Sequence, residues 1–309
     1  MATAFLGLDV GNTRLSAALV SRDGAVLALR RDEAPPTADE AIESLVRLAE
    51  EACAGAGDAP EAPPEAAGIG FGGPVDTRSG QVRGSFLSSG WQGLPLGRLL
   101  AERLGMPTWL ANDADAGGLG EARFGAGRGA SSLLYVNVGT GIGGAVLLDG
   151  ALHVGATSSA GEIGHMVLRP DGPACECGKR GCLQALASGT AIARRATERS
   201  GVALTGKQVG EAALAGDQQA LEVIGEAAWW LGLALANAAQ LLDPERIVIG
   251  GGVAELGEVF LEPVRASHRT HTIGPASQTP IVPAELGYDA GVLGAAAVAM
   301  DGAGARSNP

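Results

Sequence analysis

The chain has 309 residues, of which 46% are apolar and 18% charged, so it is long enough for one large or two medium domains with substantial cores. The formal net charge of -12 argues against a nucleic-acid partner, because phosphate binding requires clustered Lys and Arg. The sequence has neither a signal-peptide pattern nor an apolar run of about eighteen residues that would predict a membrane span. We therefore expect a cytoplasmic protein with reduced thiols and no membrane partner.

The first part of the chain predicts three strands and a helix, followed by alternating strands and helices. Within residues 4–31, the apolar segments FLGLDV, LSAALV and AVLALR are separated by the turns GNT and RDG. Residues 37–54 carry an apolar stripe at helical spacing, with Thr37 or Asp39 as the N-cap. We then expect a strand at 67–71 that ends in GGPVD, a helix at 96–104, a strand at 108–111 and a helix at 113–124.

A similar series of elements begins again near residue 133. The segment LYVNVGTGIGGAVLL aligns with LGLDVGNTRLSAALV, so that Asp9 falls on Asn137 and Gly11 on Gly139. Two copies of a strand, a Gly-rich turn and a strand predict two related α/β halves. The remaining elements expected are strands at 133–138 and 144–148, helices at 189–199, 207–215 and 217–242, strands at 246–249 and near 280–283, and a helix at 290–300, with a disordered tail beyond it.

Two of the predicted turns are candidate phosphate sites. In DVGNTR, from Asp9 to Arg14, small residues expose backbone N–H groups to an anion, Thr13 adds a hydroxyl, and Asp9 is suited to hold Mg²⁺ through water. GTGIGG, at 139–144, offers the same device in the second half. Each turn taken alone is more simply an ordinary hairpin, but the pair favours a shared polyphosphate. The glycine triplet at 250–252 follows a strand and would let a nucleoside approach the backbone closely, although a lone triplet is a weak signal.

Asn112 and Asp113 stand where a predicted strand ends and a helix begins. The simplest interpretation is an N-cap, a position that Asn and Asp commonly fill. The functional alternative is a carboxylate at an inter-domain hinge that takes a proton from a substrate hydroxyl. A general base of this kind contributes on the order of 10²–10⁴ in rate.

His165, Cys175, Cys177 and Cys182 lie close together in a segment rich in glycine and proline. Three cysteines and a histidine form a complete ligand set for tetrahedral zinc, and clustered cysteines in a reducing compartment are more often metal ligands than disulfides. A site with four protein ligands has no open position for water, so we interpret this one as structural rather than catalytic. Glu162 is not needed by the metal. It is either an ordinary solvated loop residue or, next to a fixed His165, a hydrogen-bond acceptor for a sugar hydroxyl.

Taken together, these segments resemble the ROK family of sugar kinases and sugar-responsive repressors. The resemblance covers nearly the whole chain, through LGLDVGNT, GGPVD, NDADAGGLGE, NVGTGIGGAVLLDG, GEIGH, CECGKRGCLQ, IVIGGG and GYDAGVLGAAA. It implies an actin/hexokinase-like (ribonuclease H-like) duplicated fold, with two α/β domains and a central cleft for the sugar and MgATP. We expect a small domain at 1–112 plus about 290–309, and a large domain with the zinc loop at 113–289.

The resemblance also implies roles for individual residues. Asp113 would be the catalytic base that activates the acceptor hydroxyl, and the cofactors would be ATP, Mg²⁺ and a structural Zn²⁺. The implied zinc ligands are His165, Cys175, Cys177 and Cys182. The residues expected to bind the sugar are Gly73, Asn112, Asp113, Glu162, His165 and, by position, Gln184. The residues expected to bind MgATP are Asp9, Gly11, Asn12, Thr13, Arg14, Gly139, Thr140, Gly141 and Gly251.

The chain departs from the family pattern at a few positions near these sites. The family normally has Glu two residues after the last cysteine, whereas this chain has Gln184, whose amide accepts through one oxygen and also donates. The segment FLSSGW lacks the Asn that the family often carries before the residue equivalent to Trp91. Asn12 and Arg14 replace the usual Gly and Lys, and we expect the turn to be kept because Asn tolerates a left-handed backbone.

Our main hypothesis from the sequence is ATP-dependent phosphorylation of a hexose primary hydroxyl, glucokinase-like, by a protein without the DNA-binding domain of the repressors. The altered sugar contacts leave open a kinase for another hexose, an amino sugar or a sugar-like cyclitol. An alternative of another class is a non-catalytic sugar-binding sensor, against which the retention of Asp113 argues. The resemblance further implies a homodimer or a higher homo-oligomer.

Overall fold

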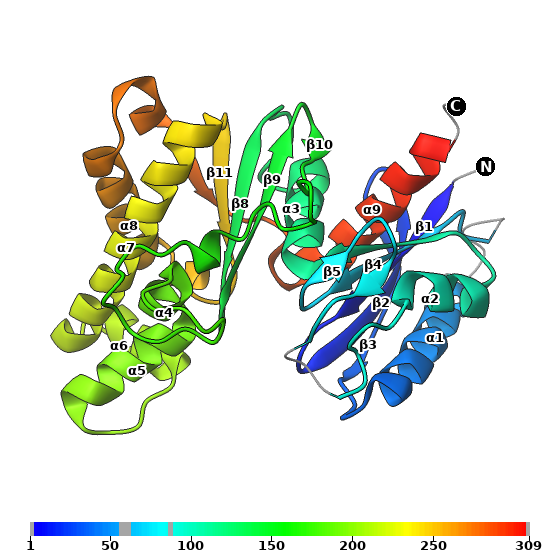
Figure 1. The fold of residues 1–309 in the computed structure, drawn as a ribbon, viewed down its shortest axis with the longest axis horizontal. Helices are drawn as coiled ribbons and strands as arrows, with labels where there is room; N and C mark the ends of the chain where they lie inside the picture. Colours follow the sequence, from blue (N-terminus) through cyan, green and yellow to red (C-terminus); the bar gives the residue numbers. More distant parts are fainter. Residues whose placement is uncertain (1–2, 56–62, 86–88, 307–309) are drawn as a thin grey trace. The chain divides into compact units, whose positions relative to one another are not determined.

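The computed structural model describes residues 3–55, 63–85 and 89–306 (Figure 1). It confirms the predicted mixed α/β class and forms two compact units. The first unit comprises Met1–Gly129, Leu152–Ala160 and Tyr288–Pro309, and the second comprises Ala130–Ala151 and Gly161–Gly287. Within the described ranges, no helix combines the length and the apolar character that crossing a membrane requires.

The first unit is built on a five-stranded sheet in the order β3-β2-β1-β4-β7. The three strands nearest the N-terminus form an antiparallel meander, as the short turns between them predict, and β1, β4 and β7 run parallel. A separate two-stranded ribbon is formed by β5 and β6. The strands are β1 (Ala4–Val10), β2 (Arg14–Ser21), β3 (Val26–Glu33), β4 (Ala67–Phe71), β5 (Val75–Asp76), β6 (Gln81–Val82) and β7 (Thr108–Asn112).

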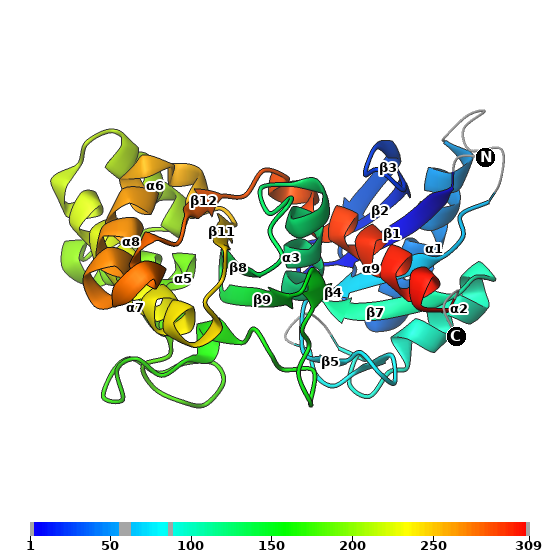
Figure 2. The ribbon, with the colours of Figure 1, turned by 90° about the horizontal axis from the view of Figure 1, so that it is seen from above.

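Two helices cover opposite faces of this sheet. α1 (Ala38–Ala54) packs Leu45 and Leu48 into one core with Leu6 and Leu8 of β1. α9 (Ala290–Arg306) lies along β1 and β4 on the other face, which Figure 2 shows from above. Successive residues of a strand point to opposite faces, so Gly7 faces α9. A Cβ on Gly7 would lie 2.1 Å from the Val292 carbonyl oxygen, so the close approach of α9 requires glycine there.

The first unit is completed by α2 (Leu96–Leu104) and α3 (Asp113–Phe124). α3 packs closely on α9, because a Cβ at Gly120 would lie 2.9 Å from the Ala290 carbonyl oxygen and one at Gly294 1.7 Å from that of Ala116. This packing places α3 in the first unit. The boundary in the structure therefore follows Gly129, whereas the sequence predicted it between Asn112 and Asp113.

The second unit contains a sheet in the order β10-β9-β8-β11-β12. β8 pairs antiparallel with β9 and parallel with β11, which repeats the arrangement of β1 with β2 and β4. β9 begins earlier than the residue 144 predicted from sequence, because Ile142 already pairs with Val138. The strands are β8 (Leu133–Val138), β9 (Ile142–Leu148), β10 (Ala151–Leu152), β11 (Arg246–Gly250) and β12 (Ile281–Pro283).

A group of helices packs on this second sheet. The long α7 (Gln218–Leu242) and α8 (Glu258–His271) lie side by side and bury Leu231, Leu235, Phe260 and Val264 in the core of the unit (Figure 1). α7 confirms the helix predicted at 217–242: Asp217 is its N-cap, and the helix ends before Asp243. The other helices here are η1 (Ile163–His165), α4 (Leu183–Ala187), α5 (Gly189–Ser200), α6 (Gly206–Leu214), η2 (Ala254–Leu256) and η3 (Gly274–Gln278), while η4 (Gly287–Asp289) precedes α9.

The structure contradicts the predicted disorder of the C-terminal tail, and it does not describe part of the FLSSGW segment. The segment from Asp301 onwards was expected to be disordered, but α9 continues to Arg306, and a Cβ at Gly302 would lie 2.3 Å from the Trp109 ring. The tail prediction was therefore wrong over residues 301–306. Phe86 to Ser88 of the FLSSGW segment lie outside the described residues.

Candidate functional site

The carboxyl ends of three parallel strands meet at one edge of the first sheet. β1, β4 and β7 are in register, so that Val10 lies opposite Phe71 and Phe71 lies opposite Asn112. The segments that leave these strand ends are the turn at 11–14, the loop around Gly73 and the first turn of α3. Open α/β sheets bind ligands outside the carboxyl ends of their strands, so this edge is a candidate binding surface.

Asn112 joins two of these segments. Its Nδ2 donates to the Gly73 carbonyl oxygen at 3.0 Å, and its Oδ1 accepts from the Ala114 N–H at 2.9 Å as the N-cap of α3. Asp113 is the first residue of α3 and is exposed, and its Oδ1 accepts from the same N–H at 2.9 Å. The N-cap interpretation is therefore confirmed, and the cap holds an exposed carboxylate at a fixed position.

Asp9 lies deeper in this edge, half-buried at the end of β1. Its carboxylate faces two glycines: a Cβ on Gly291 would lie 2.9 Å from Oδ1, and one on Gly70 would lie 3.6 Å from it. Burial raises the pKa of Asp9 to about 7, the charge of Asp113 adds to the rise, and the charges of Arg14 and Arg31 oppose it. A cation bound nearby would favour the charged form of this carboxyl group.

The turn after Asp9 is short and presents its residues to solvent. It is closed by a hydrogen bond from the Gly11 N–H to the Arg14 carbonyl oxygen at 3.0 Å, and Asn12 and Thr13 are exposed. Asn12 does not use the left-handed region, because the described non-glycine residues with positive φ are elsewhere, at Asp149, Ser158 and Asp243. The turn therefore forms without the left-handed backbone conformation that Asn12 was expected to accommodate.

The second unit carries the corresponding glycine turn between β8 and β9. The Gly139 N–H donates to the Gly141 carbonyl oxygen at 2.9 Å, and Thr140 between them is exposed. Gly251, at φ +86°, lies beside this turn: a Cβ there would be 2.5 Å from the Val138 carbonyl oxygen. The two glycine segments predicted from sequence are therefore brought together.

Hydrogen bonds attach the segment from 184 to 190 to this turn. The Ile142 N–H donates to Gln184 Oε1 at 3.0 Å, the Gly189 N–H donates to the Gly139 carbonyl oxygen at 2.8 Å, and Thr190 Oγ1 donates to the Thr140 carbonyl oxygen at 2.9 Å. Sequence reasoning missed these contacts. They join residues about fifty positions apart, and local spacing carries no signal for such pairs.

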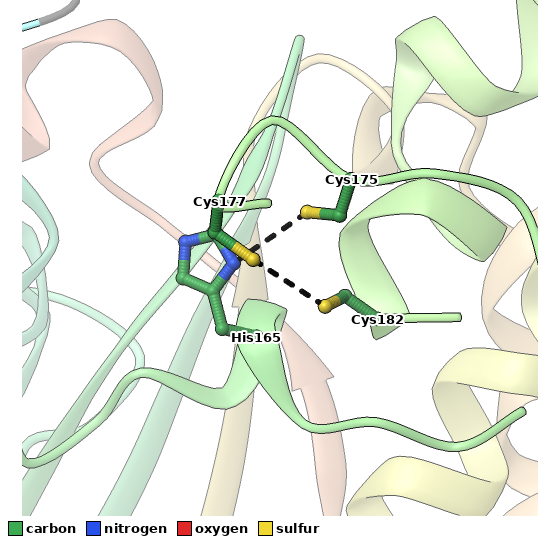
Figure 3. A group of neighbouring side chains, drawn as sticks. All are labelled: His165, Cys175, Cys177 and Cys182. Atoms are coloured by element: carbon green, nitrogen blue, oxygen red, sulfur yellow. Dashed lines mark hydrogen bonds between the residues drawn. The ribbon is translucent and has the colours of Figure 1, made fainter. Parts of the chain in front are cut away.

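The four predicted metal ligands form one cluster (Figure 3). Their donor atoms all lie within 4.8 Å of one another, with 3.7 Å between His165 Nδ1 and Cys175 Sγ and 3.6 Å between Cys177 Sγ and Cys182 Sγ. A tetrahedral site with Zn–S bonds of about 2.3 Å has ligand atoms about 3.7 Å apart. The donor set and its spacing therefore fit a zinc ion.

Tight turns in the loop bring the cysteines together. The Cys175 N–H donates to the Lys179 carbonyl oxygen at 2.8 Å, and Gly178 and Gly181 both have positive φ. A Cβ on Gly181 would lie 1.5 Å from the Arg169 carbonyl oxygen, so glycine is required there. The composition of the loop thus follows from the close approach of its own backbone.

Two of the three thiols of the cluster, Cys175 and Cys182, resist ionisation when no cation is close. Burial raises the pKa of Cys182 to about 12, with contributions from the neighbouring Cys177 and Cys175 thiols, and burial also raises the pKa of Cys175. The pKa of Cys177 is lowered, chiefly by a backbone hydrogen bond at Lys179. A divalent cation would supply the positive charge that three adjacent thiolates need.

Glu162 stands beside the cluster without belonging to it. Its Oε2 lies 3.9 Å from His165 Nε2, while the Nδ1 of the same ring points toward Cys175. Both side chains keep substantial exposure, 51% for Glu162 and 35% for His165. His165 can therefore offer one ring nitrogen to a metal while the other faces a half-exposed carboxylate.

Each unit thus gathers one set of the predicted residues. The first unit brings together the edge formed by Asp9, the turn at 11–14, Gly73, Asn112 and Asp113. The second unit brings together the turn at 139–141, Gly251, Gln184 and the metal cluster with Glu162.

Comparison with known proteins gives consistent matches over nearly the whole chain. The model of the ROK family matches residues 5–301. The glucokinase of Thermotoga maritima is 37% identical over 309 residues, which cover 95% of this chain and 96% of that protein.

Two solved structures have the same fold over nearly their full length. The ROK hexokinase of Thermus thermophilus superposes with a TM-score of 0.85 at 36% identity, covering 97% of this chain and 99% of that one. A ROK family glucokinase from Streptomyces griseus, in complex with glucose and AMPPNP, superposes with a TM-score of 0.83 at 34% identity, covering 96% and 99%. The actin-like sugar kinase fold expected from sequence is confirmed.

Proposed function

This chain belongs to the ROK family, and from that membership we propose that it is an ATP-dependent kinase that phosphorylates the primary hydroxyl of a hexose, with glucose as the default acceptor. The observation that carries the proposal is the exposed Asp113 carboxylate, held at the start of α3 by the Asn112 cap at the ligand-binding edge of the first sheet. The full-length similarity to proteins named glucokinase supports it.

In the first unit, Asp113 would act as the general base. Its carboxylate would accept the proton of the acceptor hydroxyl while the hydroxyl oxygen bonds to the γ-phosphorus and the bond to the leaving ADP oxygen breaks. Asn112 and the Gly73 loop, joined at 3.0 Å, would position the sugar hydroxyls next to this base. The sugar would be oriented by groups that are already held in place.

Asp9 and the turn from Gly11 to Arg14 would bind the phosphate side of the nucleotide. The exposed Asn12, Thr13 and Arg14 offer backbone N–H groups, a hydroxyl and a positive charge, and the Asp9 carboxyl group is suited to hold Mg²⁺ through water. Mg²⁺, when bound, neutralises charge on the transferring phosphates.

In the second unit, the turn from Gly139 to Gly141 and the adjacent Gly251 would provide backbone contacts to ATP. Glu162 and His165 would accept and donate hydrogen bonds to the sugar, and Gln184 would contribute its amide. Zn²⁺, when bound by His165, Cys175, Cys177 and Cys182, would hold this loop together as a structural ion, since four protein ligands leave no coordination site for a substrate.

The test is ATP turnover by zinc-replete protein over a panel of hexoses, amino sugars and cyclitols. We expect phosphorylation of glucose or a close relative. Turnover of none of them would refute the kinase and favour a sugar-binding sensor. Sugar binding without turnover, measured calorimetrically, would identify that sensor directly.

Gln184 favours a second candidate for the substrate of the same reaction, a phosphoryl acceptor other than glucose. An amide stands where the family has a carboxylate, and its oxygen is already bonded to the Ile142 N–H. The panel therefore includes hexoses other than glucose, amino sugars and sugar-like cyclitols. ATP dependence and reduced metal-binding thiols fit a cytoplasmic enzyme, and we propose a homodimer or a higher homo-oligomer.

A further inference from the structure

We propose that Gln184 is a positioning residue that fixes the glycine turn at 139–142 to helix α4, and that it transmits the geometry of the cysteine–histidine cluster to that turn. The proposal deepens the proposed function, since it rests on the assignment of this turn to the nucleotide. It predicts that the cysteine–histidine cluster supports the binding of the nucleotide as well as the binding of the sugar.

Gln184 contacts the glycine turn directly. Gln184 Oε1 accepts the Ile142 N–H at 3.0 Å, in a partly buried setting. A Cβ on Gly141 would lie 2.7 Å from the same oxygen, so the amide fills the space that a side chain on the turn would need. Gln184 thus satisfies a backbone donor and also limits the position of the turn.

Ile142 also contacts the segment that carries His165. A Cβ on Gly164 would lie 1.9 Å from the Ile142 carbonyl oxygen, so η1 packs directly on the start of β9. Gly164 precedes the ligand His165, and Gln184 comes two residues after the ligand Cys182. The cluster therefore joins the two segments that contact Ile142.

Backbone contacts link those two segments. The Leu183 N–H donates to the Met166 carbonyl oxygen at 2.9 Å, and Val167 forms an isolated antiparallel bridge with Cys182. Cys182 has no exposed surface. A displacement of the cluster would consequently move η1 and α4 together, and the turn between them would follow.

The chemistry of the amide explains what a glutamine offers here. A carboxylate would also accept the Ile142 N–H, but it would add negative charge beside a turn assigned to phosphates. The amide accepts without adding charge. Its Nε2 has no hydrogen-bond partner among the described residues, so a donor remains available for the ligand.

The test uses the zinc-loaded full chain and three variants. Gln184→Met removes the acceptor at similar volume, Gln184→Glu keeps an acceptor, and Gln240→Leu is a matched control at an exposed glutamine of the same unit. ADP and glucose affinities are measured by calorimetry without turnover. Backbone exchange with deuterium is measured for the peptide that spans the turn.

We expect Gln184→Met to weaken ADP binding about tenfold, as for a lost hydrogen bond to a partly buried donor, and to increase exchange at the turn. Gln184→Glu should restore protection at the turn, and Gln240→Leu should change neither quantity. Unchanged ADP affinity and exchange in Gln184→Met, with a loss of glucose affinity alone, would overturn the proposal and leave Gln184 as a sugar ligand.

The metal dependence of the wild-type chain provides a measurement that needs no variant. Chelation should raise exchange in the turn peptide while peptides of the first sheet stay protected, and unchanged protection of the turn would contradict the coupling. If wild-type protein binds no nucleotide, the proposed function fails. The deuterium-exchange experiment would then still show whether the cysteine–histidine cluster, the Gln184 amide and the turn at 139–142 move together.

Discussion

The Asn112 side chain bridges Gly73 and Ala114, with its Nδ2 3.0 Å from the Gly73 carbonyl oxygen and its Oδ1 2.9 Å from the Ala114 nitrogen. One amide therefore caps α3 and holds the neighbouring loop. The two tasks use different atoms. Aspartate keeps the acceptor that the cap needs and loses the donor that the loop needs.

We expect Asn112→Asp to keep the free energy of unfolding close to that of the wild type while the KM for the sugar rises. Asn112→Ala, which loses both contacts, should also lower the free energy of unfolding by about 1 kcal/mol. Denaturant titrations and steady-state kinetics measure the two effects. Equal stability losses in both variants would mean that the Gly73 contact, and not the cap, stabilises the protein.

The exposed carboxylate of Asp113 gives a direct test of the chemistry. Asp113→Ala should lower kcat by at least 10²-fold, on the order of 10²–10⁴ for a general base, and leave sugar binding measurable by calorimetry. Asp115, buried in the same helix, has a different environment and is not a suitable control. Asp171→Ala, at an exposed loop position, should retain full turnover. Activity that survives in Asp113→Ala would assign the proton transfer to another residue.

The metal cluster should contribute to the stability of the second unit. Chelation, or Cys182→Ala, should remove one equivalent of zinc and lower the Tm, by roughly 2–4 °C for each kcal/mol lost. Cys53 lies in α1 of the first unit, outside the cluster, so Cys53→Ser should keep its zinc and its Tm. Elemental analysis and calorimetry provide the readouts. Stoichiometric zinc in Cys182→Ala would show that this residue is not a ligand.

Gln184→Glu should lower the KM for glucose, because a carboxylate accepts two hydrogen bonds from sugar hydroxyls after one oxygen binds the Ile142 N–H. Other hexoses and cyclitols serve as comparison substrates in the same assay. A KM for glucose identical to that of the wild type would place this side chain away from the acceptor.

His268 predicts how stability depends on pH. Its side chain is 1% exposed, Nε2 has no hydrogen-bond partner among the described residues, and burial, with the charge of Arg269, lowers its pKa. The unfolded chain binds the proton more readily, near an ordinary pKa of about 6.5. Stability is therefore expected to fall as the pH drops below about 6.5, and to be unaffected by this group at higher pH.

Thermal unfolding between pH 5 and about pH 8 tests this dependence. His268→Gln should flatten the acid side of the profile, while His153→Gln, at an exposed position, should leave it unchanged. If the stability of His268→Gln falls as steeply at acid pH as that of the wild type, groups other than His268 cause the loss of stability. Sequence reasoning did not predict this environment, because His268 lies near a polar helix end in the chain.

The sequence predicted those parts of the fold and site whose determinants are local. The meander from β1 to β3 follows from short turns between apolar segments, and the cluster of His165, Cys175, Cys177 and Cys182 follows from residues close together in one loop. The packing of α3 on α9 could not be predicted, because it depends on Gly120 and Gly294, which are far apart in the chain. The bond between Gln184 and Ile142 has the same non-local origin.

α9 has a consequence for how the protein is made. β1 and β4 cannot bury the face that carries Gly7 and Gly68 until residues 290–306 reach them, and those residues are synthesised after the whole second unit. The second unit is therefore complete on the ribosome first, while the N-terminal sheet still exposes an apolar surface. Nascent chains arrested before residue 290 should be the species that chaperones bind most strongly.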